Sequence, residues 1–311
     1  MSLILLTASH GLIGSALQKY LTKNHIRSKS FDIKFNPGHP SYGSIMDKYS
    51  LKKAVNDCTG IIHLAGTSRV IFGEKNPAAC LQNNVEGTNN VINAALSSPS
   101  KPWIIYASSR EVYGQQKLLP VVEDVVLKPM NVYAHSKLAA EKKIQEAQQA
   151  GIRTSILRFS NVFGSPLDHV DRVIPAFCRA ALLGEALHID GSSNTFDFTF
   201  VDDVVRGIAE VIRIMKQNQF SLPPIHFTTG RGLTLNEAAQ IIVSKANSSS
   251  LMIERTPRSF DVSHFVGDPS RAKSILGWSS LFSFEEAIEK FLPLLKTYIE
   301  VEESFQESIA V

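Results

Sequence analysis

The chain has 311 residues, of which 44% are hydrophobic and 20% are charged, a composition typical of a globular protein rather than a disordered or fibrous one. The net charge of +3 is too small to predict a nucleic acid partner. No stretch approaches the roughly 20 apolar residues that span a bilayer. Three widely spaced cysteines without a CxxC pair predict neither disulfides nor a metal site. We therefore expect a cytoplasmic protein without a membrane partner.

Short apolar runs alternate with longer helical patterns through the first half of the chain. The runs predict strands at 3–7, 28–33, 60–65, 103–108 and 154–159, and the patterns between them predict helices at 13–23, 50–57, 78–97 and 132–150. Apolar strands that alternate with helices are typical of a parallel sheet buried on both faces. We predict an α/β fold, a Rossmann-type doubly wound parallel sheet with a smaller C-terminal substrate-binding lobe.

The pattern is less regular after residue 164. It predicts helices at 173–183, after Asp203, from near Thr234 and at 281–295, a strand at 225–228, a loop over 248–261, and fraying from Glu300. Residues 1–165 are expected to form the sheet domain, with segments near 195–230 returning to it. Residues 166–311 are expected to form mainly the lobe. Ligands of open α/β sheets bind at the carboxyl ends of the strands, so the lobe should cover that edge.

The first predicted strand runs directly into a glycine turn and a helix. Gly11 would let the backbone approach a pyrophosphate at the helix N-terminus, and Gly14 would let the helix pack closely on the strand. Ala8 stands where such turns usually have their first glycine. Asp32, about 20 residues further on, is placed to bind an adenosine ribose and to repel a 2′-phosphate. With Lys34 nearby, the pattern indicates a dinucleotide site that prefers NAD to NADP.

Oxidation of an alcohol by NAD requires a base for the hydroxyl proton. A tyrosine can serve when a cation lowers its pKa, and a lysine four residues later on a helix lies one turn away. The chain holds three such pairs, Tyr49/Lys53, Tyr113/Lys117 and Tyr133/Lys137. The first lies in a lysine-rich segment typical of a solvated face, and the second leads into a predicted loop. The third follows the fourth strand, so we predict Tyr133 and Lys137 as the functional pair.

Eight motifs follow one another along the chain: TASHGLIG at 7–14, IIHLAG at 61–66, NNVEGT at 83–88, ASSREVYG at 107–114, YAHSK at 133–137, RFSNVFG at 158–164, FDFTFVDD at 196–203 and DPSRAKSILGW at 268–278. In this order they resemble the extended short-chain dehydrogenase/reductase family, specifically its NAD-dependent sugar epimerase and dehydratase branch. The resemblance covers most of the chain.

This resemblance implies roles for residues near the end of the fourth strand. Tyr133 would be the general base, Lys137 would hold the nicotinamide ribose and lower the pKa of the tyrosine, and Ser109 would hydrogen-bond the reacting oxygen. The cofactor would be NAD, bound by Tyr133 and Lys137 together with Thr7, Gly11, Leu12, Ile13, Gly14, Asp32, Leu64, Ala65, Gly66 and Asn83. His63 is expected to be a buried, hydrogen-bonded histidine rather than a catalytic one.

The resemblance also implies a nucleotide-sugar substrate, contacted by Ser109, Glu111, Asn161 and Arg258. The planar guanidinium of Arg258 would bind the diphosphate. Two departures matter. Phe196 replaces the arginine of the family's RDF motif, which weakens the inference of a nucleotide sugar. Arg110 and Glu111 replace an acid–base pair of the dehydratases, and an arginine cannot donate a proton at neutral pH, so elimination is disfavoured.

The sequence therefore predicts an NAD-dependent nucleotide-sugar epimerase that acts at C4 through a transient 4-keto sugar, without a metal. The alternatives are a sugar-nucleotide dehydratase, an NAD-dependent dehydrogenase or ketoreductase of the same family, and a non-catalytic NAD-binding regulator. The resemblance further implies a homodimer formed through helices that flank the Tyr133 helix.

Overall fold

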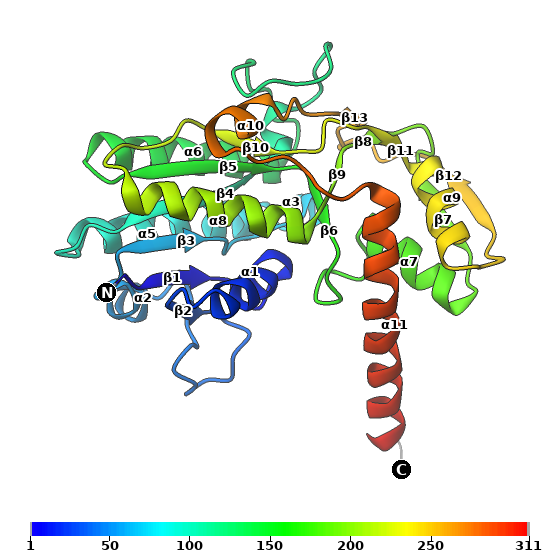
Figure 1. Ribbon diagram of the computed structural model, residues 1–311, viewed down its shortest axis with the longest axis horizontal. Coiled ribbons are helices and arrows are strands. Elements are labelled where there is room, and N and C mark those ends of the chain that lie inside the picture. Colours follow the sequence, from blue (N-terminus) through cyan, green and yellow to red (C-terminus); the bar gives the residue numbers. More distant parts are fainter. Residues whose placement is uncertain (1, 310–311) are drawn as a thin grey trace.

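The computed structural model describes residues 2–309, and its centre is a six-stranded parallel sheet in the order β10-β5-β4-β3-β1-β2 (Figure 1). The strands are β1 (Ile4–Thr7), β2 (Ser28–Phe31), β3 (Gly60–His63), β4 (Trp103–Ser109), β5 (Thr154–Phe159) and β10 (Ile225–Phe227). The strand order reverses between β1 and β3. In such sheets a ligand-binding crevice lies at the reversal, at the carboxyl ends of the strands.

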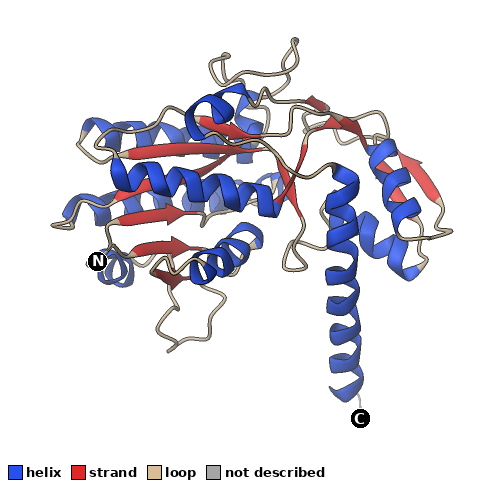
Figure 2. Ribbon diagram, viewed as in Figure 1, coloured by secondary structure: helices blue, strands red, loops and turns tan. Residues whose placement is uncertain are grey.

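Both faces of this sheet are covered by helices (Figure 2). α1 (Leu12–Lys23) and α8 (Val201–Gln217) pack together on one face, over Ile4, Leu6 and Ile62. α2 (Lys48–Val55), α5 (Gly87–Ser97) and α6 (Val132–Gln149) cover the other face, over Leu5, Ile61 and Ile104. Neighbouring residues of one strand thus enter opposite cores, which is why these strands are continuously apolar. The predicted fold class is confirmed.

The second half of the chain supplies a smaller lobe beside the carboxyl ends of the strands. Its helices α7 (Val173–Leu183), α9 (Leu235–Lys245) and α11 (Phe284–Ile309) pack on one another. Its short strands pair β6 (Asn161–Phe163) with β9 (Phe198–Phe200), β7 (Leu187–Asp190) with β12 (Met252–Arg255), and β8 (Thr195–Phe196) with both β11 (Leu233–Thr234) and β13 (His264–Phe265). α10 (Ser270–Leu276) returns to β10.

Three local predictions were wrong. The predicted loop at 248–261 contains strand β12, whose exposed side chains give no apolar signal because its backbone pairing with β7 forms it. The tail from Glu300 stays helical to the end of α11, where Ile299 is buried and Glu302 pairs with Arg179. The helix predicted at 78–97 is divided into α4 (Pro77–Leu81), a π-helical turn (Gln82–Glu86) and α5, and α3 (Val70–Lys75) before it was not predicted.

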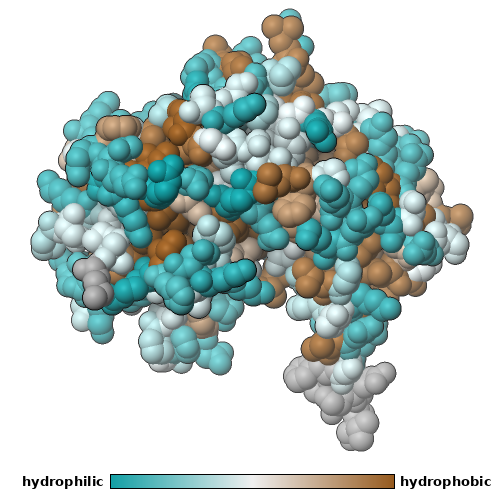
Figure 3. Space-filling view, viewed as in Figure 1, coloured by the Kyte–Doolittle hydropathy of each residue, from teal (hydrophilic) through white to brown (hydrophobic). Residues whose placement is uncertain are grey.

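The surface agrees with the composition. Hydrophilic residues cover most of the face seen in Figure 3, and hydrophobic residues gather there in smaller patches. Between residues 2 and 309, no helix combines the length and the apolar character that crossing a bilayer requires.

Candidate active site

The turn after β1 is held in a conformation that only small residues allow. Ala8 has a φ of 53°, and its carbonyl oxygen accepts a 3.1 Å hydrogen bond from the amide of Gly11. A Cβ on Gly14 would lie 2.0 Å from that oxygen, so no other residue fits there without moving the turn. A Cβ on Gly11 would lie 3.4 Å from it, which is ordinary contact. The turn therefore brings the N-terminus of α1, with its free amides, to the edge of the sheet.

Asp32 follows β2 and is buried beside this turn. One carboxylate oxygen accepts a 2.8 Å hydrogen bond from the amide of His10, and the other accepts one of 2.8 Å from the amide of Lys34. These bonds fix the carboxylate at the cleft, where each oxygen keeps a second lone pair for a ribose hydroxyl. The glycine turn, the helix N-terminus and this carboxylate fit the adenosine and pyrophosphate of NAD.

A cleft of about 760 Å³ runs between the carboxyl ends of the strands and the lobe. All but one of the predicted site residues line it: Gly11, Leu12, Ile13, Gly14, Asp32, Leu64, Ala65, Gly66, Asn83, Ser109, Glu111, Tyr133, Lys137, Asn161 and Arg258. The exception is Thr7, which is fully buried behind the cleft. Its hydroxyl oxygen accepts hydrogen bonds of 3.1 Å from the amides of Leu64 and Ala65, and so holds that stretch of the wall.

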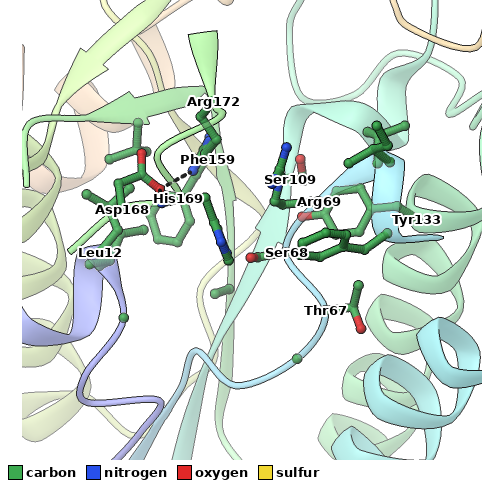
Figure 4. Close-up of a pocket in the computed structure, with 18 of the residues that line it drawn as sticks. Leu12, Thr67, Ser68, Arg69, Ser109, Tyr133, Phe159, Asp168, His169 and Arg172 are labelled. Atoms are coloured by element: carbon green, nitrogen blue, oxygen red, sulfur yellow. Dashed lines mark hydrogen bonds and ion pairs between the residues drawn. The ribbon is translucent and has the colours of Figure 1, made fainter. Parts of the chain in front are cut away.

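Ser109, at the end of β4, and Tyr133, in the first turn of α6, meet in this cleft (Figure 4). Burial raises the pKa of Tyr133 to about 12, and a hydrogen bond from Ser109 opposes that rise. Asn131 caps α6 by accepting a 2.8 Å hydrogen bond from the amide of Ala134, and thereby fixes the turn that carries the tyrosine. The hydroxyl pair stands where an alcohol could exchange its proton.

Lys137 lies one helical turn after Tyr133, but its ammonium group bonds elsewhere. Its Nζ donates a 2.9 Å hydrogen bond to the carbonyl oxygen of Ala107 and lies 5.9 Å from the centre of the Tyr133 ring. Burial lowers the pKa of Lys137 to about 8. Burial of the phenol dominates the pKa of Tyr133 in this arrangement, and a lowering of that pKa by Lys137 stays a prediction.

Glu111 is held on both carboxylate oxygens. Its Oε1 forms a 2.8 Å ion pair with Nη2 of Arg110, and its Oε2 accepts a 3.1 Å hydrogen bond from Nδ2 of Asn131. Arg110 also donates from Nε to Oδ1 of Asn161, at 3.1 Å. Its guanidinium lies 4.8 Å from the centre of the Phe196 ring. Phe196, which replaces the arginine of the family's RDF motif, thus packs against Arg110 at the end of β4.

The loop that leads into α7 places further side chains across the cleft from Tyr133. Arg69 pairs with Asp171 across the cleft, and its guanidinium lies 4.7 Å from the centre of the Phe72 ring. Arg172 pairs with Asp168 at 3.3 Å (Figure 4). Sequence reasoning missed these cleft residues because they lie in irregular segments that carry no motif.

Asn84, next to the predicted Asn83, makes most of the side-chain hydrogen bonds of the π-helical turn (Gln82–Glu86). Its Oδ1 accepts a 2.7 Å hydrogen bond from the amide of Thr67, and its Nδ2 donates one of 2.7 Å to the hydroxyl of Ser136. Asn83 lines the cleft and reaches the Thr67 hydroxyl at 3.5 Å. The NVxGT spacing, read from Asn84 rather than Asn83, was a signal that could have found this residue.

The remaining predictions concern Arg258, His63 and a metal site. Arg258 lines the cleft and forms a 2.8 Å ion pair with Asp261. His63 is buried, with its ring nitrogens 3.1 Å from the hydroxyls of Thr7 and Thr88, which confirms the expected structural histidine. Across residues 2–309 there is no cluster of three or more His, Cys, Asp or Glu side chains that could hold a metal ion.

The chain is similar to curated proteins along nearly its whole length. It is 29% identical to UDP-glucuronic acid decarboxylase 3 of Arabidopsis thaliana, over 94% of this chain and 87% of that protein. It is 27% identical to a putative UDP-glucose 4-epimerase of Methanocaldococcus jannaschii, over 94% of this chain and 98% of that protein.

Solved structures share the fold. MoeE5 in complex with UDP-glucose and NAD superposes with a TM-score of 0.87 at 24% identity, over 95% of this chain and 99% of that one. The UDP-glucose 4-epimerase of Thermotoga maritima gives a TM-score of 0.87 at 23% identity, over 96% and 99%. The model of the NAD dependent epimerase/dehydratase family matches residues 4–221. The chain therefore belongs to this NAD-dependent enzyme family, as its motifs predicted.

Proposed function

We propose that the protein is an NAD-dependent nucleotide-sugar epimerase that inverts C4 through a transient 4-keto sugar. The observation that carries the proposal is the meeting of the Ser109 and Tyr133 hydroxyls in the cleft, at the sheet edge that also holds the glycine turn and Asp32. A base beside a cofactor cleft has no use in a protein that only binds NAD, so this observation disfavours the regulator alternative.

Some residues of the cleft would bind the cofactor, and Tyr133 would transfer a proton. Asp32 and the turn at Gly11 would hold the adenosine and pyrophosphate, and Lys137 would hold the nicotinamide ribose. When bound, NAD supplies a reversible hydride acceptor and an oxidised ring that carries positive charge. Burial raises the pKa of Tyr133, so the phenol is protonated at neutral pH when no cofactor is bound. Added positive charge nearby would lower this pKa, so that Tyr133 could take the proton of O4.

Ser109 donates a hydrogen bond to O4 and steadies the oxygen as it becomes a ketone. Once the 4-keto sugar presents its other face, Tyr133 would return the proton to O4 as hydride returns to the opposite face of C4. The substrate loses one hydride and one proton and regains both. The reaction has no net oxidation.

The state of Glu111 favours epimerisation over elimination. A dehydratase needs a free carboxylate to remove a proton from carbon and an acid to protonate the leaving hydroxyl. Both oxygens of Glu111 are engaged, by Arg110 and by Asn131, and the neighbouring arginine cannot act as the acid. Epimerisation needs only one group that takes and returns a proton, and Tyr133 suffices for it.

A nucleotide sugar is the substrate class that several observations support. Relatives are named for UDP-glucose and UDP-glucuronic acid, and the half-exposed guanidinium of Arg258 is suited to a diphosphate. A homodimer and a cytoplasmic location remain predictions. Light scattering on the purified protein tests the first of them.

The decisive experiment incubates the purified protein and NAD with UDP-glucose and with UDP-galactose. We expect proton NMR to show each sugar converted to its C4 epimer, with no accumulation of NADH at 340 nm. Loss of water detected by mass would indicate a dehydratase, and stoichiometric NADH would indicate a dehydrogenase. Either outcome would contradict the proposal.

A further inference from the structure

The loop at residues 165–172 belongs to the lobe and lies across the cleft from the predicted reacting groups. It joins β6 to α7. His169 and Arg172 of this loop line the cleft on one side, and Ser109 and Tyr133 stand on the other (Figure 4). A sugar bound at Tyr133 would therefore lie between the sheet and this loop.

Few bonds fix the position of this loop. Within residues 2–309 its hydrogen bonds and ion pairs stay inside the loop, apart from two. The carbonyl oxygen of Arg172 accepts a 2.8 Å hydrogen bond from the amide of Ala176 in α7. The Asp171 carboxylate forms an ion pair with Arg69, which follows β3 of the main sheet. The pair with Arg69 is thus the polar contact that ties this loop to the sheet side of the cleft.

Arg69 is held in place by its neighbours. Its side chain is only 9% exposed, and its guanidinium lies 4.7 Å from the centre of the Phe72 ring. The same ring meets the His169 ring of the loop edge-on, with 5.7 Å between the centroids. The Asp171 carboxylate is 60% exposed, and an ion pair at such a position contributes little when it stands alone. Here the ion pair and the ring contact act together to join the two sides of the cleft.

The segment that carries Arg69 is itself bonded to the elements around the site. The amide of Thr67 donates a 2.7 Å hydrogen bond to Oδ1 of Asn84 in the π-helical turn. Oε1 of Glu74 accepts a 2.9 Å hydrogen bond from the amide of Val132, the first residue of α6. Because α6 also carries the proposed base, Arg69 links the loop to the same framework that positions the reacting hydroxyls.

From these contacts we infer that Arg69 is a positioning residue, which holds the loop 165–172 over the sugar and so keeps the 4-keto intermediate in the cleft. The inference rests on the proposed function, because retention matters only to a reaction that passes through a transient ketone. The same contact keeps Arg172 opposite Tyr133. Burial raises the pKa of Tyr133, and the positive charge of Arg172 opposes that rise.

Early opening of the loop would have a defined chemical consequence. In the first half of the reaction the C4–H bond would break and its hydride pass to bound NAD, while the O4 proton passes to Tyr133. If the 4-keto sugar then left, the protein would retain one NADH for each ketone released. Complete epimerisation returns the hydride and leaves no NADH. The amount of NADH per turnover therefore measures how often the intermediate escapes.

The first test requires neither substrate nor turnover. Arg69→Met removes the cation and leaves the sequence of the loop unchanged, so hydrogen exchange at the amides of residues 165–172 can be compared directly by mass spectrometry. We expect exchange to be faster by about fivefold, the upper end of what a partly exposed pair contributes. Lys143→Met, which breaks an exposed pair with Glu146 on α6, should leave this loop unchanged. Equal exchange in wild type and Arg69→Met would overturn the inference.

The second test measures retention of the ketone with UDP-glucose and NAD. Arg69→Met and Asp171→Asn should each form about fivefold more NADH per turnover than the wild type, whereas Asp171→Glu, which keeps the charge, should retain the ketone. The double variant Arg69→Met/Asp171→Asn should leak no more than either single variant, because both changes remove the same pair. Glu146→Gln, at a carboxylate of equal exposure, should not leak. Additive leakage from the two single changes would contradict a role that acts through the pair.

Release rates distinguish failure of this inference from failure of the proposed function. Stopped-flow fluorescence measures the release of UDP-glucose from the NAD-loaded Tyr133→Phe variant, with and without Arg69→Met. If the wild type epimerises neither UDP-glucose nor UDP-galactose but Arg69→Met speeds both exchange and release, the reaction assignment fails and the holding role of Arg69 stands. If the wild type epimerises and Arg69→Met leaks no NADH, the inference fails even where exchange is faster, since other contacts then retain the ketone.

Discussion

The ammonium group of Lys137 donates a 2.9 Å hydrogen bond to the carbonyl oxygen of Ala107 in β4. Within residues 2–309 this is the only hydrogen bond of the ammonium group, which is otherwise surrounded by protein. Burial lowers the pKa of the lysine from its ordinary 10.5 to about 8, which corresponds to roughly 3 kcal/mol of lost stability when it is charged.

Replacing Lys137 with methionine should therefore stabilise the fold at neutral pH. The folded pKa lies below the unfolded one, so the cost is full below pH 8 and disappears as the pH rises toward 10.5. Allowing for the lost hydrogen bond, we expect a gain of about 2 kcal/mol at pH 7 and almost none above pH 10.5. Urea unfolding of nucleotide-free wild type and variant at both pH values measures it. A gain that does not change with pH would contradict the buried charge.

Tyr133→Phe should reduce epimerisation by about 10³-fold, since it removes the only proposed proton acceptor. Affinity for NAD should change little, because the glycine turn and Asp32 remain. The matched control is Tyr49→Phe, at the same spacing from a lysine but 80% exposed on α2. It should leave turnover unchanged. Equal losses in the two variants would remove Tyr133 from the mechanism.

The two glycines of the first turn should respond differently to alanine. Gly14→Ala would place a Cβ 2.0 Å from the Ala8 carbonyl oxygen, so we expect a loss of roughly 2–4 kcal/mol in stability. Gly11→Ala meets only a 3.4 Å contact and should keep the stability while weakening NAD binding, because its methyl group faces the pyrophosphate. Thermal unfolding and NAD titration separate the two effects. Equal melting temperatures would contradict the packing role of Gly14.

Asp32→Asn should weaken the preference for NAD over NADP. The amide can still accept one of the two backbone hydrogen bonds, but it no longer repels a 2′-phosphate, and Lys34 lies beside it. We expect the ratio of the two dissociation constants to move by about tenfold toward NADP. Fluorescence titration with both cofactors measures this ratio. A ratio equal to that of the wild type would place the discriminating group elsewhere.

The main sheet could be predicted because its strands carry their own signal. Residues such as Ile61 and Ile62 enter opposite cores, so a buried parallel strand is apolar at every position. Strand β12 carries no such signal, since its side chains are exposed and only backbone pairing defines it. The sequence is therefore informative where side chains decide the structure.

The same contrast applies to the site. Residues within motifs, such as Ser109 and Tyr133, could be assigned to the cleft from their spacing. Their electrostatics could not, because the pKa of Tyr133 depends first on burial and then on Ser109 and Glu111, and no local sequence pattern reports how deeply a side chain is buried. The pairing of Arg69 with Asp171 joins residues about a hundred positions apart. No local pattern reports such a contact.

The last strand of the main sheet, β10, reaches its place beside β5 only after the chain has passed through much of the lobe. A fragment ending at residue 165 would therefore lack β10 and α8. It would expose an unpaired strand edge and the apolar surface under that helix, both of which promote aggregation. The half of the chain that carries the glycine turn is thus not a detachable module, because elements from beyond residue 165 complete its sheet.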